Sequence, residues 1–258
     1  MSTKKGIWIT SLDKDEALAQ QLAQTGATYG LGTGGHFWID DLDKMEWSGA
    51  VPELAKPEIA CWVVVGPTAR FGVESIRQGL ALLAQTIVSV RGCGFPILVV
   101  GTDAVVDPAT LPTPLRGAEG VTMASLGPKL AARANTPWKP LPTSYRLDPR
   151  PLPGIGLWFE VAPAQGEWKG AIFGVTGAEV DAHGVGPAGT IPQRAVLEYP
   201  FKGMKLQLGE TEYLAWGLSN TLTPQESYFI RVSTTPKSIL FGELPTGDEA
   251  DLYTIMLT

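Results

Sequence analysis

The stretch IACWVVVG, residues 59–66, decides the class of fold. It is apolar at nearly every position and does not alternate with polar residues, so we expect both of its faces to be buried. FPILVVGTD, residues 95–103, contains a similar continuous apolar run. Strands of this kind, rich in Val and Ile, are typical of parallel sheets that helices cover on both faces. We therefore predict an α/β layer in this part of the chain.

Helical patterns separate these strands. GIWITS, residues 6–11, is a short apolar run, and Leu18 and Leu22 then fall four positions apart on one helical stripe. Three further elements complete the pattern: a strand at 36–40 after a glycine-rich break, a helix at 74–90 and a strand at 121–126. This order predicts a doubly wound parallel sheet within an α/β domain of residues 1–136.

Composition limits the classes of function. The chain has 258 residues, of which 44% are apolar and 18% charged, as in a soluble globular protein of one or two domains. Its net charge is −6 and it has no Lys/Arg run, which argues against direct nucleic-acid binding. No apolar stretch approaches the roughly 20 residues that cross a bilayer, and the first apolar run is too short for a signal peptide. We expect a cytoplasmic protein that binds no membrane.

The cysteines and histidines give no sign of a metal site. Cys61 and Cys93 each lie in an apolar segment, so we expect buried free thiols in a reducing compartment. His36 and His183 are far apart and neither has a further ligand at metal-binding spacing. A zinc site and a Ser-His-Asp triad are therefore not expected.

The texture of the sequence changes after the first domain. Residues 137–153 carry six prolines, which favour extended backbone, and we interpret them as a linker. Residues 154–258 then form short β-rich runs separated by turn residues, which predicts a smaller all-β antiparallel sandwich or barrel of seven or eight strands. The predicted runs are 157–161, 170–175, 195–201, 204–208, 212–218, 227–232, 238–242 and 251–257.

The first domain resembles the TIR (Toll/interleukin-1 receptor) family over residues 5–135. ITSLDKDEALAQQLA, residues 9–23, looks like the family's first strand and acidic helix start. FWIDDLDKMEWSG, residues 37–49, is similar to its second strand and BB loop, and WVVVGPTARF, residues 62–71, to its third strand and following loop. FPILVVGTD and the later LPTPLRG, residues 111–117, resemble the fourth strand and its Leu-Pro segment. The C-terminal half resembles no family.

The resemblance implies a flavodoxin-like fold and one of two functions. Many bacterial TIR effectors hydrolyse NAD⁺ at the nicotinamide–ribose bond once they assemble, and for this chain that implies antiphage or stress defence. Other members are non-enzymatic scaffolds that signal through TIR–TIR contacts. A nucleoside hydrolase or transferase on a flavodoxin-like sheet is a third interpretation. NAD⁺ would be the substrate, and the reaction would need no metal.

The resemblance also implies a catalytic carboxylate, Glu74. Departure of nicotinamide builds positive charge on the ribose, and a nearby carboxylate stabilises that charge. In the family an aromatic residue stands four positions before this glutamate and a small residue four after it. If Phe71 and Gly79 are taken for these residues, Ser75 falls at the catalytic position instead. A one-residue bulge at Gly72 would place Glu74 at that position. The alternative is that Glu74 only complements the helix macrodipole.

Further residues are carried over from the family to the nucleotide site and to a self-association surface. The nucleotide would be bordered by Thr10, Ser11, Leu12, Asp40, Arg70 and Phe71. Arg70 would replace an arginine that the family often has after the first strand, and Asp40 could instead cap the BB loop. Self-association would use Asp41, Lys44 and Trp47, of which Trp47, expected to be exposed, could instead stack on ligand or pack internally.

The β-rich half has no catalytic signature of its own. We expect it to bind a protein partner or sensor, or to organise oligomers. Trp158, Trp168 and Trp216 are interpreted as core residues because large apolar side chains are usually buried.

Overall fold

The computed structural model describes residues 5–194, 196–245 and 251–258. The chain divides into two compact units. The first is Met1–Leu42 with Glu46–Leu141, and the second is Asp43–Met45 with Pro142–Thr258. The main division therefore falls inside the proline-rich stretch, and each unit has sheets of its own.

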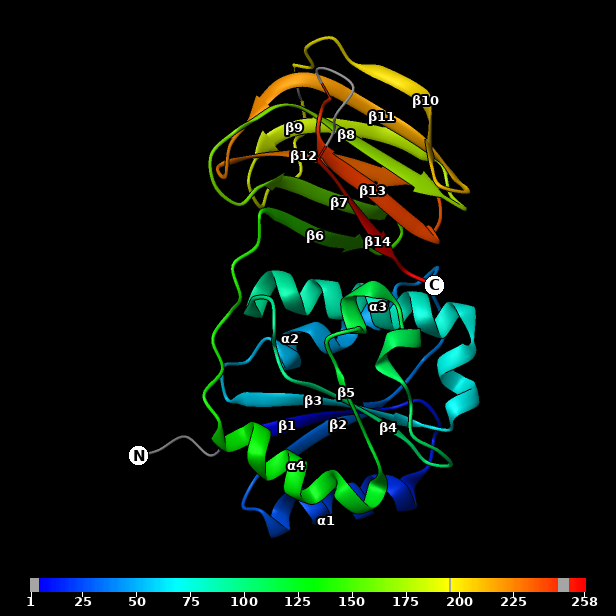
Figure 1. Cartoon of the computed structure of the whole chain (residues 1–258), viewed down its shortest axis with the longest axis vertical. Coiled ribbons are helices and arrows are strands. Elements are labelled where there is room, and N and C mark those ends of the chain that lie inside the picture. Colours follow the sequence, from blue (N-terminus) through cyan, green and yellow to red (C-terminus); the bar gives the residue numbers. More distant parts are fainter. Residues whose placement is uncertain (1–4, 195, 246–250) are drawn as a thin grey trace. The chain divides into compact units, whose positions relative to one another are not determined.

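The first unit is a five-stranded parallel sheet in the order β2-β1-β3-β4-β5 (Figure 1). Its elements are β1 (Gly6–Ser11), α1 (Glu16–Thr28), β2 (Gly32–Phe37), α2 (Val51–Leu54), β3 (Ile59–Gly66), α3 (Glu74–Arg91), β4 (Ile97–Gly101), β5 (Glu119–Val121) and α4 (Met123–Asn135). The predicted doubly wound parallel sheet is confirmed, and the strand order is flavodoxin-like.

Helices cover both faces of this sheet. Figure 1 shows α1 and α4 on one side and α2 and α3 on the other. On the α1/α4 side one buried cluster joins alternate residues of the central strands, such as Ile9, Val63 and Val65, to Leu22 of α1 and Leu130 of α4. Burial on both faces explains why the strand sequences do not alternate.

Local side-chain hydrogen bonds fix where two of the helices begin. Asp15 caps α1 by accepting a hydrogen bond of 2.9 Å from the backbone N–H of Leu18. Thr122 and Ser125 form a capping box at the start of α4. The expected strand at 121–126 was therefore wrong beyond its first residue, because this capping pair starts a helix directly after Val121.

The second strand includes the glycines that were expected to break the chain. β2 spans Gly32–Phe37 and ends before residues 38–40 of the predicted strand. A Cβ at Gly34 would lie 2.7 Å from the Trp8 ring, and one at Gly35 would lie 2.5 Å from the Ile9 carbonyl oxygen. The glycines are therefore what allows β2 to pack this closely on β1.

The second unit is a β-sandwich of two antiparallel sheets. Their orders are β10-β11-β8-β13-β14 and β6-β7-β12-β9. The strands are β6 (Tyr145–Leu152), β7 (Gly156–Pro163), β8 (Trp168–Thr176), β9 (Val180–Pro187), β10 (Phe201–Leu208), β11 (Thr211–Leu222), β12 (Glu226–Val232), β13 (Ser238–Glu243) and β14 (Leu252–Met256). Aromatic side chains from the two sheets meet in the core, with the rings of Phe159 and Phe173 5.4 Å apart.

Three strand predictions in this half need correction. β6 lies inside the expected linker, because Pro149 and Pro151 are tolerated on an edge strand. β9 was missed, since its Gly- and His-containing sequence has weak strand propensity. In the run 195–201, residue 195 lies outside the described residues and the strand begins only at Phe201.

The three tryptophans expected in the core of this unit differ in exposure. Trp168 is buried, whereas Trp158 and Trp216 are half-buried. Cations lie over the rings of the latter two, Arg231 over Trp158 and Lys202 over Trp216. Their rings therefore shield apolar surface and contact a charge at the same time.

A fully buried carboxylate joins the strands of the four-stranded sheet. Glu160 of β7 has 0% exposure and accepts hydrogen bonds from Arg146 and Arg150 of β6. The Ser227 hydroxyl on β12 and the Gly189 backbone N–H also donate to it, at 2.7 and 2.9 Å. Burial alone would raise the pKa of Glu160, but these hydrogen bonds and the two guanidinium charges together lower it below its ordinary value of 4.5.

We predict that Glu160→Gln lowers the free energy of unfolding of the second unit by about 3 kcal/mol at neutral pH, because it leaves two arginines without their buried partner. Because the folded pKa lies below 4.5, the carboxylate's contribution is complete above pH 4.5 and is lost as the pH falls towards the folded pKa. The difference between wild type and variant should therefore shrink in acid. Chemical denaturation across pH measures it.

The exposed Glu226 at the start of β12 provides the matched control. Glu226→Gln should change the unfolding free energy by less than about 0.5 kcal/mol. A stability of Glu160→Gln equal to wild type at neutral pH would show that the buried carboxylate does not join these strands energetically.

Candidate functional site

The candidate site lies at the carboxyl edge of the parallel sheet. β1 and β3 are neighbours there, yet α1 and α3, which follow them, cover opposite faces (Figure 1). Their loops therefore diverge and leave a crevice, which is where open α/β sheets bind ligands.

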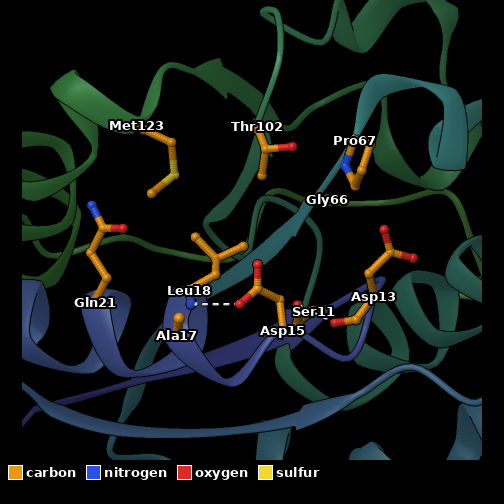
Figure 2. A pocket seen from close by; sticks show the side chains of 10 residues that line it. All are labelled: Ser11, Asp13, Asp15, Ala17, Leu18, Gln21, Gly66, Pro67, Thr102 and Met123. Atoms are coloured by element: carbon orange, nitrogen blue, oxygen red, sulfur yellow. Dashed lines mark hydrogen bonds between the residues drawn. The ribbon is translucent and has the colours of Figure 1, made fainter.

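A pocket of about 430 Å³ occupies the α1 side of this crevice (Figure 2). Its walls come from the loop after β1, the start of α1, the ends of β3 and β4, and the first residue of α4. The lining residues are Ser11, Asp13, Asp15, Ala17, Leu18, Gln21, Gly66, Pro67, Thr102 and Met123. Its size is in the range of small-molecule sites.

Two aspartates give the pocket a negative character. Figure 2 shows Asp13 and Asp15 beside the same hollow, both from the loop after β1. The Ser11 hydroxyl donates to the Asp13 carbonyl oxygen at 2.8 Å and so shapes this loop. Among the described residues that line the pocket there is no Lys or Arg. Such a lining favours ligand hydroxyl groups or a cationic ring over a bare phosphate.

Arg70 connects the two diverging loops. It belongs to the 3₁₀ turn Thr68–Gly72 after β3, and its Nε lies 3.0 Å from Asp13 Oδ1. Its Nη2 donates to the Leu12 carbonyl oxygen at 3.1 Å. The Arg70 side chain is 34% exposed, so this positive charge stays accessible beside the acidic pocket.

Close packing holds the ends of β3 and β4 in place. A Cβ at Gly66 would lie 2.8 Å from Leu12 Cβ, so only glycine allows the loop after β1 to approach this closely. The Thr68 backbone N–H and hydroxyl both donate to Asp103, each at 2.8 Å, and these hydrogen bonds lower the pKa of that carboxyl. The loops at the edge of the pocket are thus tied to one another.

The predicted catalytic glutamate lies outside the pocket lining. Glu74 is the first residue of α3 and is exposed, and the next residue, Ser75, donates its hydroxyl to Asp40 Oδ2 at 2.7 Å. One turn later Gly79 lies under Trp38, since a Cβ there would be 2.6 Å from Trp38 Cζ2. The structure therefore brings the Ser75 hydroxyl against Asp40.

The other predicted site residues divide into two groups. Ser11 lines the pocket and Arg70 contacts its rim. Thr10, Leu12 and Phe71 are buried in the core. The Thr10 hydroxyl accepts a 2.8 Å hydrogen bond from Trp62 Nε1, which gives it a packing role.

The expectation of an exposed Trp47 needs correction. Trp47 is 2% exposed and lies in the 3₁₀ helix Glu46–Ala50, which packs against α3. Its burial comes from this packing against α3, a tertiary contact between segments that are distant in the sequence. Of the three residues predicted for self-association, Lys44 is exposed and Asp41 is half-buried.

Sequence reasoning missed several lining residues. Asp13 and Asp15 were recognised only as helix-start residues, although they follow a strand at the edge where ligands bind. Thr102 carried the same signal, because it comes directly after β4. Met123 was not expected to line a site, because residues 121–126 were predicted to form a strand.

The thiols and the first-unit histidine take part in packing. Burial raises the pKa of the Cys61 thiol to about 12, whereas Cys93 is only half-buried, contrary to expectation. His36 Nδ1 accepts a hydrogen bond from Trp8 Nε1 at 3.1 Å, and burial lowers its pKa. Within residues 5–194, 196–245 and 251–258, no group of three or more His, Cys, Asp or Glu side chains is arranged to hold a metal ion.

Comparison with known proteins adds no relative. No protein-family model matches the sequence, and a search of curated proteins gives no significant match. In the part of the chain that the structure describes, no helix has both the length and the hydrophobicity needed to cross a membrane.

We predict that Gly79→Ala destabilises the first unit by up to about 2 kcal/mol. Crowding against Trp38 costs about 1–3 kcal/mol, and the better helix propensity of Ala offsets about 1 kcal/mol. In a Trp38→Leu background the same change should be neutral or stabilising. Thermal or chemical denaturation of the four proteins measures this coupling. An equal loss of unfolding free energy in both backgrounds would show that Gly79→Ala does not act through contact with Trp38.

Proposed function

We propose that the first unit hydrolyses NAD⁺ at the nicotinamide–ribose bond, at the carboxyl edge of its sheet. The observation that carries the proposal is the acidic pocket at the β1/β3 switch point of a sheet in flavodoxin-like order. The resemblance to TIR domains supports the same reaction. It also implies an effector that assembly activates, in bacterial antiphage or stress defence, with the second unit binding a sensor or partner.

The charges at this edge suit different parts of a dinucleotide. Asp13 and Asp15 can accept hydrogen bonds from the hydroxyl groups of one ribose. Arg70, on the loop that leads from the pocket to α3, would contact the pyrophosphate. The second ribose would then extend towards Glu74 and Asp40, on the α3 side.

The reaction itself makes modest demands on the protein. The C–N bond between ribose C1′ and nicotinamide breaks, and nicotinamide leaves with the bonding electron pair. Water then attacks C1′, and the products are nicotinamide, ADP-ribose and one proton. A carboxylate beside the ribose stabilises the oxocarbenium-like transition state. We assign this role to Glu74, and we assign to Asp40, which Ser75 holds at 2.7 Å, a hydrogen bond from the same ribose.

We predict that purified full-length protein, at high concentration or under crowding, releases nicotinamide from NAD⁺. Glu74→Gln should lower kcat about 100-fold or more, because it removes the charge that stabilises the transition state. Ser75→Ala, at the next helix position, keeps the Glu74 charge but removes the hydroxyl that holds Asp40, so it should raise KM and retain most of kcat. Asp13→Asn should raise KM more than it lowers kcat. Chromatography of free nicotinamide measures all four proteins.

Three results would count against this proposal. An unchanged rate of nicotinamide release by Glu74→Gln would show that Glu74 does not take part in the reaction. Release of bases from free nucleosides but not from NAD⁺ would favour a nucleoside hydrolase. No release by wild type in any assembled state would remove the enzymatic proposal altogether.

One observation favours a second candidate, a non-enzymatic TIR scaffold. In the register that takes Phe71 and Gly79 for the family's aromatic and small residues, Ser75 holds the glutamate position, and its hydroxyl donates to Asp40. A serine there cannot supply the anionic charge. A chain that assembles in solution but leaves NAD⁺ intact would fit this candidate.

A further inference from the structure

A second pocket lies at the opposite, amino edge of the parallel sheet. Its volume is about 380 Å³. It is bounded by the residues that enter β1 and β3, the last residue of α3, the end of α4 and the segment that follows α4. None of its lining residues lines the acidic pocket. It is a separate feature of the same unit.

Positive charge is concentrated in this second pocket. Lys5, Arg91 and Arg133 line it, and Glu58 is the one carboxylate among its described lining residues. The balance of formal charges is therefore +2, from three cations and one anion, on a chain whose net charge is −6. Such a local excess marks a place where anions are attracted.

Neutral carbonyl groups hold two of these cations in position. Lys5 Nζ donates to the Ala134 carbonyl oxygen at 2.7 Å. Arg91 donates to three backbone carbonyls, those of Leu54, Lys56 and Ile59. A carbonyl orients a cation without cancelling its formal charge, so both remain able to attract an anion.

The third cation has a carboxylate partner that it shares. Arg133 binds Glu119, and Lys129 binds the same carboxylate. One negative charge is thus divided between two positive ones. Arg133 therefore adds to the positive potential of the pocket despite its ion pair.

One aromatic ring lines the pocket beside these cations. Trp138 lines the pocket, and its ring meets Phe95 edge to face with centroids 5.6 Å apart. The Arg91 guanidinium lies 4.6 Å from the centroid of the Phe95 ring. Cation and aromatic surface are consequently adjacent, which is the combination that recognises a phosphate attached to a planar base.

We infer that this pocket binds a small phosphorylated molecule with an aromatic base, of the nucleoside monophosphate class. The phosphate contacts Lys5 and Arg133, and the base lies against Trp138. This inference is independent of the proposed hydrolase, because the site is at the other edge of the sheet and uses none of its residues.

Calorimetric titration of the full-length chain with adenosine 5′-monophosphate tests the inference. Lys5→Met and Trp138→Leu should each weaken binding about tenfold, because each removes one of the two recognition elements. Adenosine and inorganic phosphate, which each keep one element, should bind more weakly than the monophosphate. Rising ionic strength should weaken monophosphate binding, and this test needs no variant.

Two controls separate this pocket from the acidic one. Lys14→Met removes an exposed lysine outside the pocket, and Asp13→Asn alters the acidic pocket; both should leave the affinity unchanged. Four results would overturn the inference: no binding of the monophosphate, equal binding of adenosine, an affinity that Lys5→Met and Trp138→Leu do not change, or an affinity that Asp13→Asn abolishes.

Discussion

β1 and β3 pair in parallel, yet the helices that follow them cover opposite faces of the sheet, and this constraint determines the geometry of the candidate site. Parallel strands need crossover connections, and where the direction of the crossovers reverses, neighbouring loops must separate. Gly66 lets the loop after β1 approach the end of β3, and Arg70 spans from one loop to the other. The crevice therefore follows from strand order, and its rigidity follows from a few specific contacts.

The two edges of the sheet carry opposite charge. At the carboxyl edge Asp13 and Asp15 line a pocket without a lining Lys or Arg, and Arg70 beside it is bound to Asp13. At the amino edge cations outnumber carboxylates, and backbone carbonyls hold them in position. In the second unit, the buried Glu160 carboxylate accepts hydrogen bonds from two arginines, the Ser227 hydroxyl and the Gly189 backbone N–H.

Sequence reasoning predicted the parts of the fold that strong local patterns determine. β1 and β3 were placed at their observed residues because each is a continuous apolar run. β2 was misplaced because close approach to Trp8, a tertiary contact, overrides the poor strand propensity of its glycines. Ser11, which was expected at the nucleotide, lines the pocket, whereas placing Met123 there required knowing that α4 begins at this residue. The burial of Trp47 depends on packing against α3, which no local pattern reveals.

Hydrogen–deuterium exchange of the wild-type chain, with and without ADP-ribose, tests the central claim most directly. This reaction product keeps the groups that the carboxyl edge is proposed to bind, and it needs no turnover. The account predicts slower exchange in the loops after β1 and β3, over residues 12–18 and 67–75, with little change at the other edge. Protection confined to the second unit, or no protection at all, would contradict a nucleotide site at the β1/β3 crevice.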